Sequence, residues 1–197
     1  MTNSTHAKSA PPIYSSLIGH FLVAAPHMND SRFNQAVIYI CEHDEDGAMG
    51  LIVNKTIKSL NFGELTKSLD IGTPRNYPER PVYKGGPVEP KRGYILHSQD
   101  QMMPDTIPIT DAVALSLQVD MLNDIALGLG PNQLKIMLGY TGWSAGQLED
   151  EMREGMWFHL PASETMLFEE AGDTLWEAAF RLAGFDAGAL SAQSGSA

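Results

Sequence analysis

The sequence predicts an α+β protein, a single compact domain with a mixed β-sheet, hairpins and flanking helices. Short runs rich in β-branched and aromatic residues predict strands, and polar residues and glycines at fixed spacing predict helix ends. The two kinds of element mingle without the strict alternation of a doubly wound sheet. With 197 residues, 43% of them hydrophobic, the chain can bury one sizeable core.

The predicted strands are, in chain order, residues 36–41, 51–54, 82–83, 94–96, 113–117 and 134–138. The dipeptide Asp46-Gly47 separates the first two and is typical of a type I′ hairpin turn, in which both central residues have positive φ. The Gly85-Gly86-Pro87 segment is expected to join the third and fourth strands in a second hairpin.

Helices are expected to begin at Asn61, Asp120, Ser144 and Asp173, and the last three to end near Gly128, Gly155 and Gly184. Asn61 and Ser144 are each followed three residues later by Glu or Gln, which is the spacing of a capping box. In the last helix Leu175, Ala179 and Leu182 fall on one side, which is expected to face the core. The proline-rich residues 72–81 form a predicted loop.

Residues 1–13 and 191–197 are small and polar, and we expect them to be flexible tails around one domain of residues 14–190. The formal net charge is −11, which disfavours direct binding to nucleic acid. The sequence has neither the apolar segment of a signal peptide nor an apolar run long enough for a membrane span. One cysteine excludes an internal disulfide, so a cytoplasmic protein is expected.

The stretch CEHDED at residues 41–46 brings a thiol, an imidazole and four carboxylates together. Alternation along a strand predicts that Cys41 and His43 share a face, as a nucleophile and its base must. Acidic neighbours raise the pKa of a thiol, however, so the competing interpretation is a small buried residue at a strand end. His43 with Asp44 or Asp46 supplies too few ligands for a catalytic metal, and we expect neither a metal nor a cofactor.

Two glycine-containing segments are candidate ligand contacts. Residues 84–88 (KGGPV) lack the spacing of a phosphate loop and form either a tight hairpin or a close backbone approach to a ligand. Residues 138–151 (LGYTGWSAGQLEDE) lead into a helix start whose amides could hold an anion. The acidic residues 149–151 favour a self-capped helix instead. Trp143 either lines a pocket or covers this helix start.

Five segments together resemble the YqgE/AlgH family of bacterial proteins: AxPxMxDxxF at 24–33, EHDEDGAMGLIVN at 42–54, VYKGGPV at 82–88, Leu96-His97, and LGYTGWSAGQLEDE at 138–151. The resemblance runs from about Ser16 to Leu190. It implies a compact protein with a mixed sheet and flanking helices. The family's label as transcriptional regulators of alginate synthesis rests on a genetic association, and it implies no established activity and no DNA-binding mechanism.

Ten residues occupy family motif positions at predicted strand ends and loop mouths, where scaffolds present functional groups. They are Glu42, His43, Asn54, Gly85, Gly86, His97, Tyr140, Trp143, Gln147 and Glu149. If their strands lie in one sheet, we expect these residues to gather around one cleft. The occupant is an unknown small molecule or protein partner.

The favoured function is a ligand- or partner-binding regulatory protein without catalysis of its own. The alternative is an enzyme, a hydrolase in which Glu42 or His43 does acid–base work and Asn54 or backbone amides stabilise charge. No set of nucleophile, base and orienting group can be recognised from the spacing of residues in the sequence, so no catalytic residue is assigned. The third interpretation, a DNA-binding regulator, is opposed by the acidic charge and by the lack of a basic helix pair.

Overall fold

The structure is a computed structural model that describes residues 16–169 and 172–184. The predicted tails and the predicted domain limits at residues 14 and 190 lie outside these residues. The strands are β1 (His20–Ala24), β2 (Val37–Asp44), β3 (Gly47–Ile52), β4 (Thr56–Asn61), β5 (Pro81–Lys84), β6 (Val88–Ser98), β7 (Ile107–Pro108), β8 (Val113–Ser116), β9 (Leu134–Ser144) and β10 (Trp157–Pro161). The helices are α1 (Phe62–Ser68), α2 (Val119–Leu127), α3 (Gln147–Arg153), α4 (Glu164–Glu169) and α5 (Gly172–Leu182).

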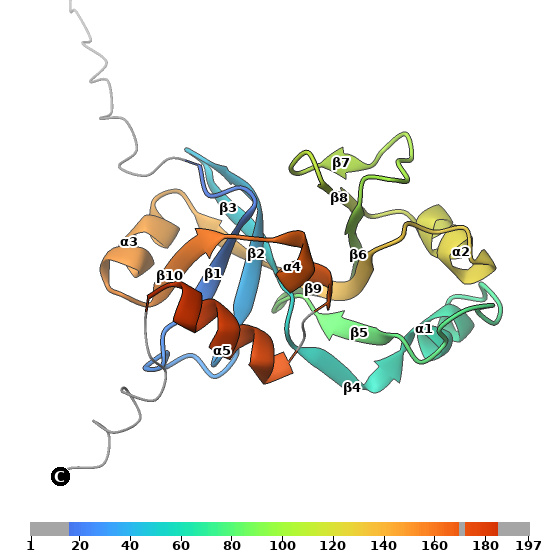
Figure 1. The fold of residues 1–197 in the computed structure, drawn as a ribbon, viewed down its shortest axis with the longest axis horizontal. Coiled ribbons are helices and arrows are strands. Elements are labelled where there is room, and N and C mark those ends of the chain that lie inside the picture. Colours follow the sequence, from blue (N-terminus) through green and yellow to red (C-terminus); the bar gives the residue numbers. More distant parts are fainter. Residues whose placement is uncertain (1–15, 170–171, 185–197) are drawn as a thin grey trace, which may run out of the picture.

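The strands form one curled sheet in the order β10-β1-β2-β3-β9-β6-β8-β7, with β5 pairing both β9 and β4. The β5–β9 pair is parallel and the other pairs are antiparallel, so the sheet is mixed. Strand β9 connects two halves: its first residues pair with β5 and β6, and its last residues pair with β3. Figure 1 shows β1–β3 and β10 on one side of this strand and β4–β8 on the other. The predicted α+β fold class with a mixed sheet is confirmed.

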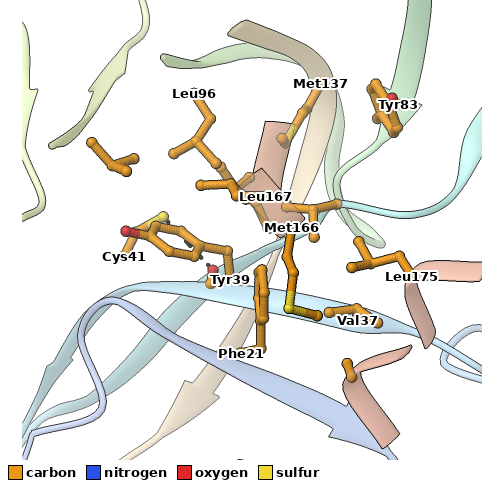
Figure 2. Packing of buried hydrophobic residues seen from close by; sticks show 14 of the residues in the cluster. Phe21, Val37, Tyr39, Cys41, Tyr83, Leu96, Met137, Met166, Leu167 and Leu175 are labelled. Atoms are coloured by element: carbon orange, nitrogen blue, oxygen red, sulfur yellow. Dashed lines mark hydrogen bonds between the residues drawn. The ribbon is translucent and has the colours of Figure 1, made fainter. Parts of the chain in front are cut away.

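The inner face of the curled sheet carries the largest apolar cluster, which joins the two halves. Phe21 and Tyr39 come from β1 and β2, whereas Leu96 and Met137 come from β6 and β9 (Figure 2). Helices α4 and α5 close this cluster, with Leu167 of α4 fully buried among the strand residues. Burying such side chains contributes about 1.5–3 kcal/mol each, so this cluster is a main source of stability.

The outer face of each half is covered by its own helices. Helix α3 lies against β3, β9 and β10, and its residue Leu148 belongs to a second cluster with Ile38 and Ile40 of β2. Helices α1 and α2 cover β5, β6 and β9, and their residues Phe62 and Met121 are both fully buried in a third cluster. The right-hand half in Figure 1 therefore has a helical layer of its own, separate from α3.

The predicted β2–β3 hairpin is confirmed, but its turn is not type I′. The turn residues are Glu45 and Asp46, neither of which has positive φ, and Gly47 follows with φ of 141°. The Asp46 amide instead donates to the Asp44 carboxylate (2.9 Å), which stabilises the turn through a side chain.

The prediction that Cys41 and His43 share a face is wrong. The β2–β3 register shifts between Ile40 and Glu42, so Cys41 is the extra residue of a β-bulge and the alternation of side chains is broken there. Cys41 packs on the inner face, while His43 lies opposite Ala48 of the outer cluster.

The predicted second hairpin is also wrong, because β5 and β6 do not pair with each other. Both flank β9: Val82 and Ile95 are partners of the same residue, Ile136, on its two sides. The chain crosses β9 through Gly85-Gly86-Pro87. A short glycine-rich segment between two predicted strands is typical of a hairpin. Here β9, which comes from a distant part of the sequence, lies between the two strands and prevents them from pairing.

The helix ends are predicted in part. Asn61 and Glu64 form the expected capping box of α1, with both hydrogen bonds at 2.9 Å. Helix α2 ends as predicted at Gly128 (φ 78°), but its N-cap is Gln118, and Asp120 lies within the first turn. Helix α3 is capped by Gly146, because Ser144 still belongs to β9.

The last helix is predicted correctly, except that one of the three residues expected to face the core does not do so. Leu175 and Ala179 are buried, but Leu182 is 66% exposed. Trp176 and Phe180 take its place against the sheet, with their rings stacked at 5.1 Å, and the Trp176 indole donates to the carbonyl oxygen of Ala24 (2.8 Å). Strands β1, β4, β7 and β10 and helix α4 were not predicted. None of the helices in the described residues is both long enough and apolar enough to cross a bilayer.

Candidate functional site

The ten candidate residues lie in separate parts of the fold. Four surround α3 and the end of β9, three lie where the chain crosses β9, two are buried singly, and Glu42 is exposed on the inner side of β2. None of them lines the groove between α1, α2 and the sheet or the hollow between the end of α2 and the start of β9. Their role as one binding cleft therefore stays a prediction.

His43 connects the end of β2 to α3. Its Nδ1 accepts a hydrogen bond from the Leu17 amide (3.0 Å), so the ring hydrogen is on Nε2, which donates to Glu149 (2.9 Å). The two side chains are 6% and 21% exposed. Burial acts to raise the pKa of Glu149, but the hydrogen bond from His43, helped by nearby charges, holds that pKa below its usual range. Both ring nitrogens of His43 are thus engaged in structural contacts.

Trp143 and Gln147 meet at a carboxylate that was not predicted. Glu151 Oε2 accepts hydrogen bonds from the indoles of Trp143 (2.9 Å) and Trp157 (2.8 Å), and its Oε1 accepts one from Gln147 (2.9 Å). The two indole rings lie edge to face at 6.0 Å. Trp143 is only 7% exposed and packs in the outer cluster. The spacing of four between Gln147 and Glu151 was the sequence signal for this contact.

Gly85, Gly86 and Tyr140 lie together where the chain crosses β9. The Gly85 amide donates to the Leu138 carbonyl, and the Gly85 carbonyl accepts from the Ile52 amide, both at 2.8 Å. A Cβ on either glycine would lie under 3.0 Å from backbone atoms of β9. The Tyr140 ring packs edge to face on Tyr94 at 5.9 Å. The close approach predicted for these glycines is therefore to a neighbouring strand.

Asn54 and His97 are buried at unrelated positions. Asn54 Oδ1 accepts from the Val37 amide (2.9 Å), and its Nδ2 donates to the carbonyls of Gln35 (2.9 Å) and Gly172 (3.2 Å). Asn54 thus joins the start of β2 to the start of α5. His97 has no exposed surface, and its two nitrogens contact the Ser98 carbonyl (2.8 Å) and the Ser116 hydroxyl (2.9 Å).

His97 is expected to make stability pH-dependent. Burial lowers its pKa from 6.5, against the opposing effects of the Ser98 carbonyl and the Asp100 charge. The unfolded chain then binds the proton more readily, so the contribution of His97 to stability is complete above about pH 6.5 and is lost as the pH falls. We expect the free energy of unfolding, measured with urea between about pH 7.5 and pH 5.5, to fall less in His97→Asn than in the wild type. Equal falls in the two proteins would contradict this.

Cys41 is buried and Glu42 is exposed. The Cys41 thiol donates to the Tyr39 carbonyl (3.8 Å), and Figure 2 shows it enclosed by the inner cluster. Burial, and then the charge of Glu42, raise the pKa of the Cys41 thiol far above its ordinary value. A thiol in these surroundings is inert, which supports the interpretation of Cys41 as a packing residue. In residues 16–169 and 172–184, no three His, Cys, Asp or Glu side chains could hold a metal ion together.

An apolar groove that the sequence did not predict lies between α1, α2 and the sheet. Its volume is about 200 Å³. Its sides are apolar residues of the two helices, and β6 and β9 form its floor with Ile95, Ile136 and Leu138. Leu69 and Val119 at its border are 44% and 52% exposed. Lys91 also borders the groove, and its exposed ammonium group belongs to no ion pair of the described residues.

Gly93 lines the groove and leaves open space there. Gly93 is the cross-strand partner of Leu138, so its missing side chain would point to the face that α1 and α2 cover. A Cβ there would meet no atom within 4 Å, and φ is not in the left-handed region. Neither backbone conformation nor a close neighbour requires glycine at this position, unlike at Gly85 and Gly86. A glycine inside a strand was the only sequence signal for it.

The chain matches known proteins over most of its length. The profile of the AlgH-like family matches residues 21–188. A UPF0301 protein from Methylocella silvestris is 44% identical over 189 residues, which cover 92% of each chain. A UPF0301 protein from a Marinomonas species is 43% identical over 180 residues, which cover 90% of this chain and 95% of the relative.

Two solved structures share the fold. The solution structure of the AlgH protein from Pseudomonas aeruginosa has a TM-score of 0.75 and 38% identity, and the match covers 97% of this chain and 100% of that chain. A crystal structure of a protein from Corynebacterium diphtheriae has a TM-score of 0.67 over 83% of this chain and 85% of that one. At 20% identity, the second match shows the fold alone. The resemblance that the sequence motifs indicated is confirmed, and the chain belongs to the AlgH-like family.

Proposed function

We propose that the protein is a regulatory binding protein of the cytoplasm, without catalysis of its own, that takes up a small ligand with a short apolar body and an anionic end. The groove at Gly93 carries this proposal. Apolar pockets with a single charged group are typical of small-molecule sites, where the apolar walls supply affinity and the charge fixes the orientation. In this groove Lys91 is the cation.

The orientation and hydrogen bonds of the polar motif residues support a binding protein over a hydrolase. Glu42 and His43 point to opposite sides of β2, because their partners Met49 and Ala48 belong to different clusters. A general base needs a ring nitrogen within reach of substrate, and both nitrogens of His43 are occupied. Asn54 is likewise saturated by backbone contacts.

The charge of the chain supports an indirect effect on transcription, if the family association extends to this protein. A net charge of −11 repels the phosphate backbone of DNA. We propose that any regulation proceeds through the bound ligand or through a protein partner that senses it.

Filling the groove is expected to abolish ligand binding. In Gly93→Leu the new side chain enters open space between α1 and α2, so the fold is retained and the ligand is excluded. The probe is octanoate, which has an apolar tail and one negative charge. We expect octanoate to raise the melting temperature of the wild type, because it binds only the native state, and to leave that of Gly93→Leu unchanged.

Ser59→Leu is the matched control, since it adds the same side chain at an exposed position of β4 away from the groove. This variant is expected to respond to octanoate as the wild type does. Lys91→Gln is expected to bind octanoate about tenfold more weakly, because it loses the charge pair. A wild-type response in Gly93→Leu would show that the groove is not the binding site.

A further inference from the structure

A second hollow lies at the opposite end of α2 from the groove. Its volume is about 260 Å³, and it is bounded by the loop before β5, the end of α2 and the start of β9. The residues that matter for its chemistry are Asn76, Tyr77, Arg80, Gly128, Gly130 and Asn132. The Arg75 amide donates to the Ala126 carbonyl (2.8 Å), which holds the loop against the helix.

Among the described residues that line this hollow, Arg80 is the only cation, and it is half-buried. One guanidinium nitrogen, Nη1, donates to the Leu134 carbonyl (3.2 Å), and the guanidinium carbon lies 5.4 Å from the centre of the Tyr77 ring. A guanidinium has five N–H donors, so most of them have no acceptor among the described residues. Burial lowers the pKa of Arg80, which reflects the cost of partly removing this charge from water.

Arg80 is half-buried and has no carboxylate partner, whereas Arg75 and Arg181, which also form no ion pair with a described residue, are exposed. The exposed residues Arg32, Arg92 and Arg153 each form an ion pair with a carboxylate two or three residues away. Arg80 forms none with any residue in 16–169 or 172–184. The adjacent Glu79 contacts Asn61 instead (3.1 Å). In so acidic a chain, a half-buried arginine without a counter-charge is a place where an external anion would be stabilised.

The rest of the hollow can supply neutral donors and an apolar surface. The side-chain amides of Asn76 and Asn132 form no hydrogen bond with a described residue. Ile125, Pro131 and Leu134 add apolar atoms to its lining, and Tyr77 is 71% exposed. This composition suits a ligand that combines an oxyanion with an aromatic body.

We propose that the hollow at Arg80 binds the carboxylate or phosphate group of a small aromatic molecule. Arg80 supplies two parallel N–H donors to the oxyanion, and the amides of Asn76 and Asn132 contact its remaining oxygen atoms. The Tyr77 ring holds the guanidinium plane in position, and the apolar residues that line the hollow contact the ligand body. This site is distinct from the groove at Gly93 and does not depend on it.

Calorimetric titration of the full chain with phenyl phosphate and with benzoate tests the proposal. The two probes share an aromatic ring and differ in the anion, so the tighter binder identifies the preferred group. Arg80→Gln is expected to weaken that binding at least about tenfold, and Arg80→Lys to weaken it less, because lysine keeps the charge and loses the planar fork.

Arg92→Gln is the matched control, since it removes an exposed arginine on β6 that already has a carboxylate partner. This variant is expected to bind both probes as the wild type does. Circular dichroism of each variant excludes loss of the fold as the cause of weaker binding. The proposal is overturned if neither probe binds the wild type, or if Arg80→Gln and Arg92→Gln weaken binding equally, which would indicate a general charge effect.

Discussion

Replacing Gly86 by alanine is expected to destabilise the protein by at least about 4 kcal/mol, a loss at the upper end for single substitutions. The new Cβ would lie under 3.0 Å from the carbonyl carbon and oxygen of Tyr140 and from the amide nitrogen of Thr141. These are backbone atoms in the middle of β9, so no rotamer change relieves the clash. Urea unfolding followed by circular dichroism measures the loss, and an unfolded or insoluble variant is also consistent with it.

Gly93→Ala provides the comparison, since it is the same change in the same half of the sheet. Nothing lies within 4 Å of the new methyl group, so its effect on the free energy of unfolding is expected to stay within about 1 kcal/mol. Similar losses at Gly86 and Gly93 would mean that the close crossing of β9 does not determine the effect. The pair thus separates a glycine that the fold requires from one that leaves space.

The parts of the fold that the sequence predicts well are those set by local chemistry. The capping box at Asn61, the glycine end of α2 and the strand at 36–41 depend on neighbours within a few residues. The errors arise where distant chain segments decide the outcome. Strand β9 separates β5 from β6, and no pattern near Gly85 indicates its insertion.

In the candidate site, too, contacts between distant segments could not be predicted from local sequence. The motif residues His43 and Glu149 are 106 positions apart in sequence and meet through the pairing of β2, β3 and β9, which the strand signals alone do not specify. The buried Lys135 was missed as well: its ammonium donates to the Val53 carbonyl (3.0 Å) and lies 4.6 Å from the Tyr83 ring centre. A lysine within an apolar strand was its only signal.

The two proposed binding sites were not predicted for a physical reason. Motif positions draw attention to polar and aromatic residues, but in this fold several of those side chains make structural hydrogen bonds. The groove includes the open space at Gly93, and the hollow at Arg80 depends on the absence of a nearby carboxylate. Both are properties of the space between elements, which only the folded structure displays.

Trp143→Ala is expected to cost about 3–5 kcal/mol of unfolding free energy, because it removes a large buried ring from the outer cluster and leaves a cavity beside Trp157. Trp143→Phe keeps most of the apolar volume and removes only the hydrogen bond to Glu151, which still accepts from Trp157 and Gln147. Its expected cost is about 1–2 kcal/mol. Urea unfolding of both variants measures the difference.

The same pair of variants tests whether Trp143 belongs to a binding site or to the scaffold. If Trp143 stabilises only the packing of α3 on the sheet, folded Trp143→Phe should bind octanoate with unchanged affinity, since the groove lies in the other half of the molecule, under α1 and α2. Loss of octanoate binding in Trp143→Phe, at a temperature where the variant is fully folded, would instead connect this tryptophan to ligand uptake. Because Glu151 and the second indole keep α3 in place in this variant, such a loss could not be attributed to unfolding of the helix.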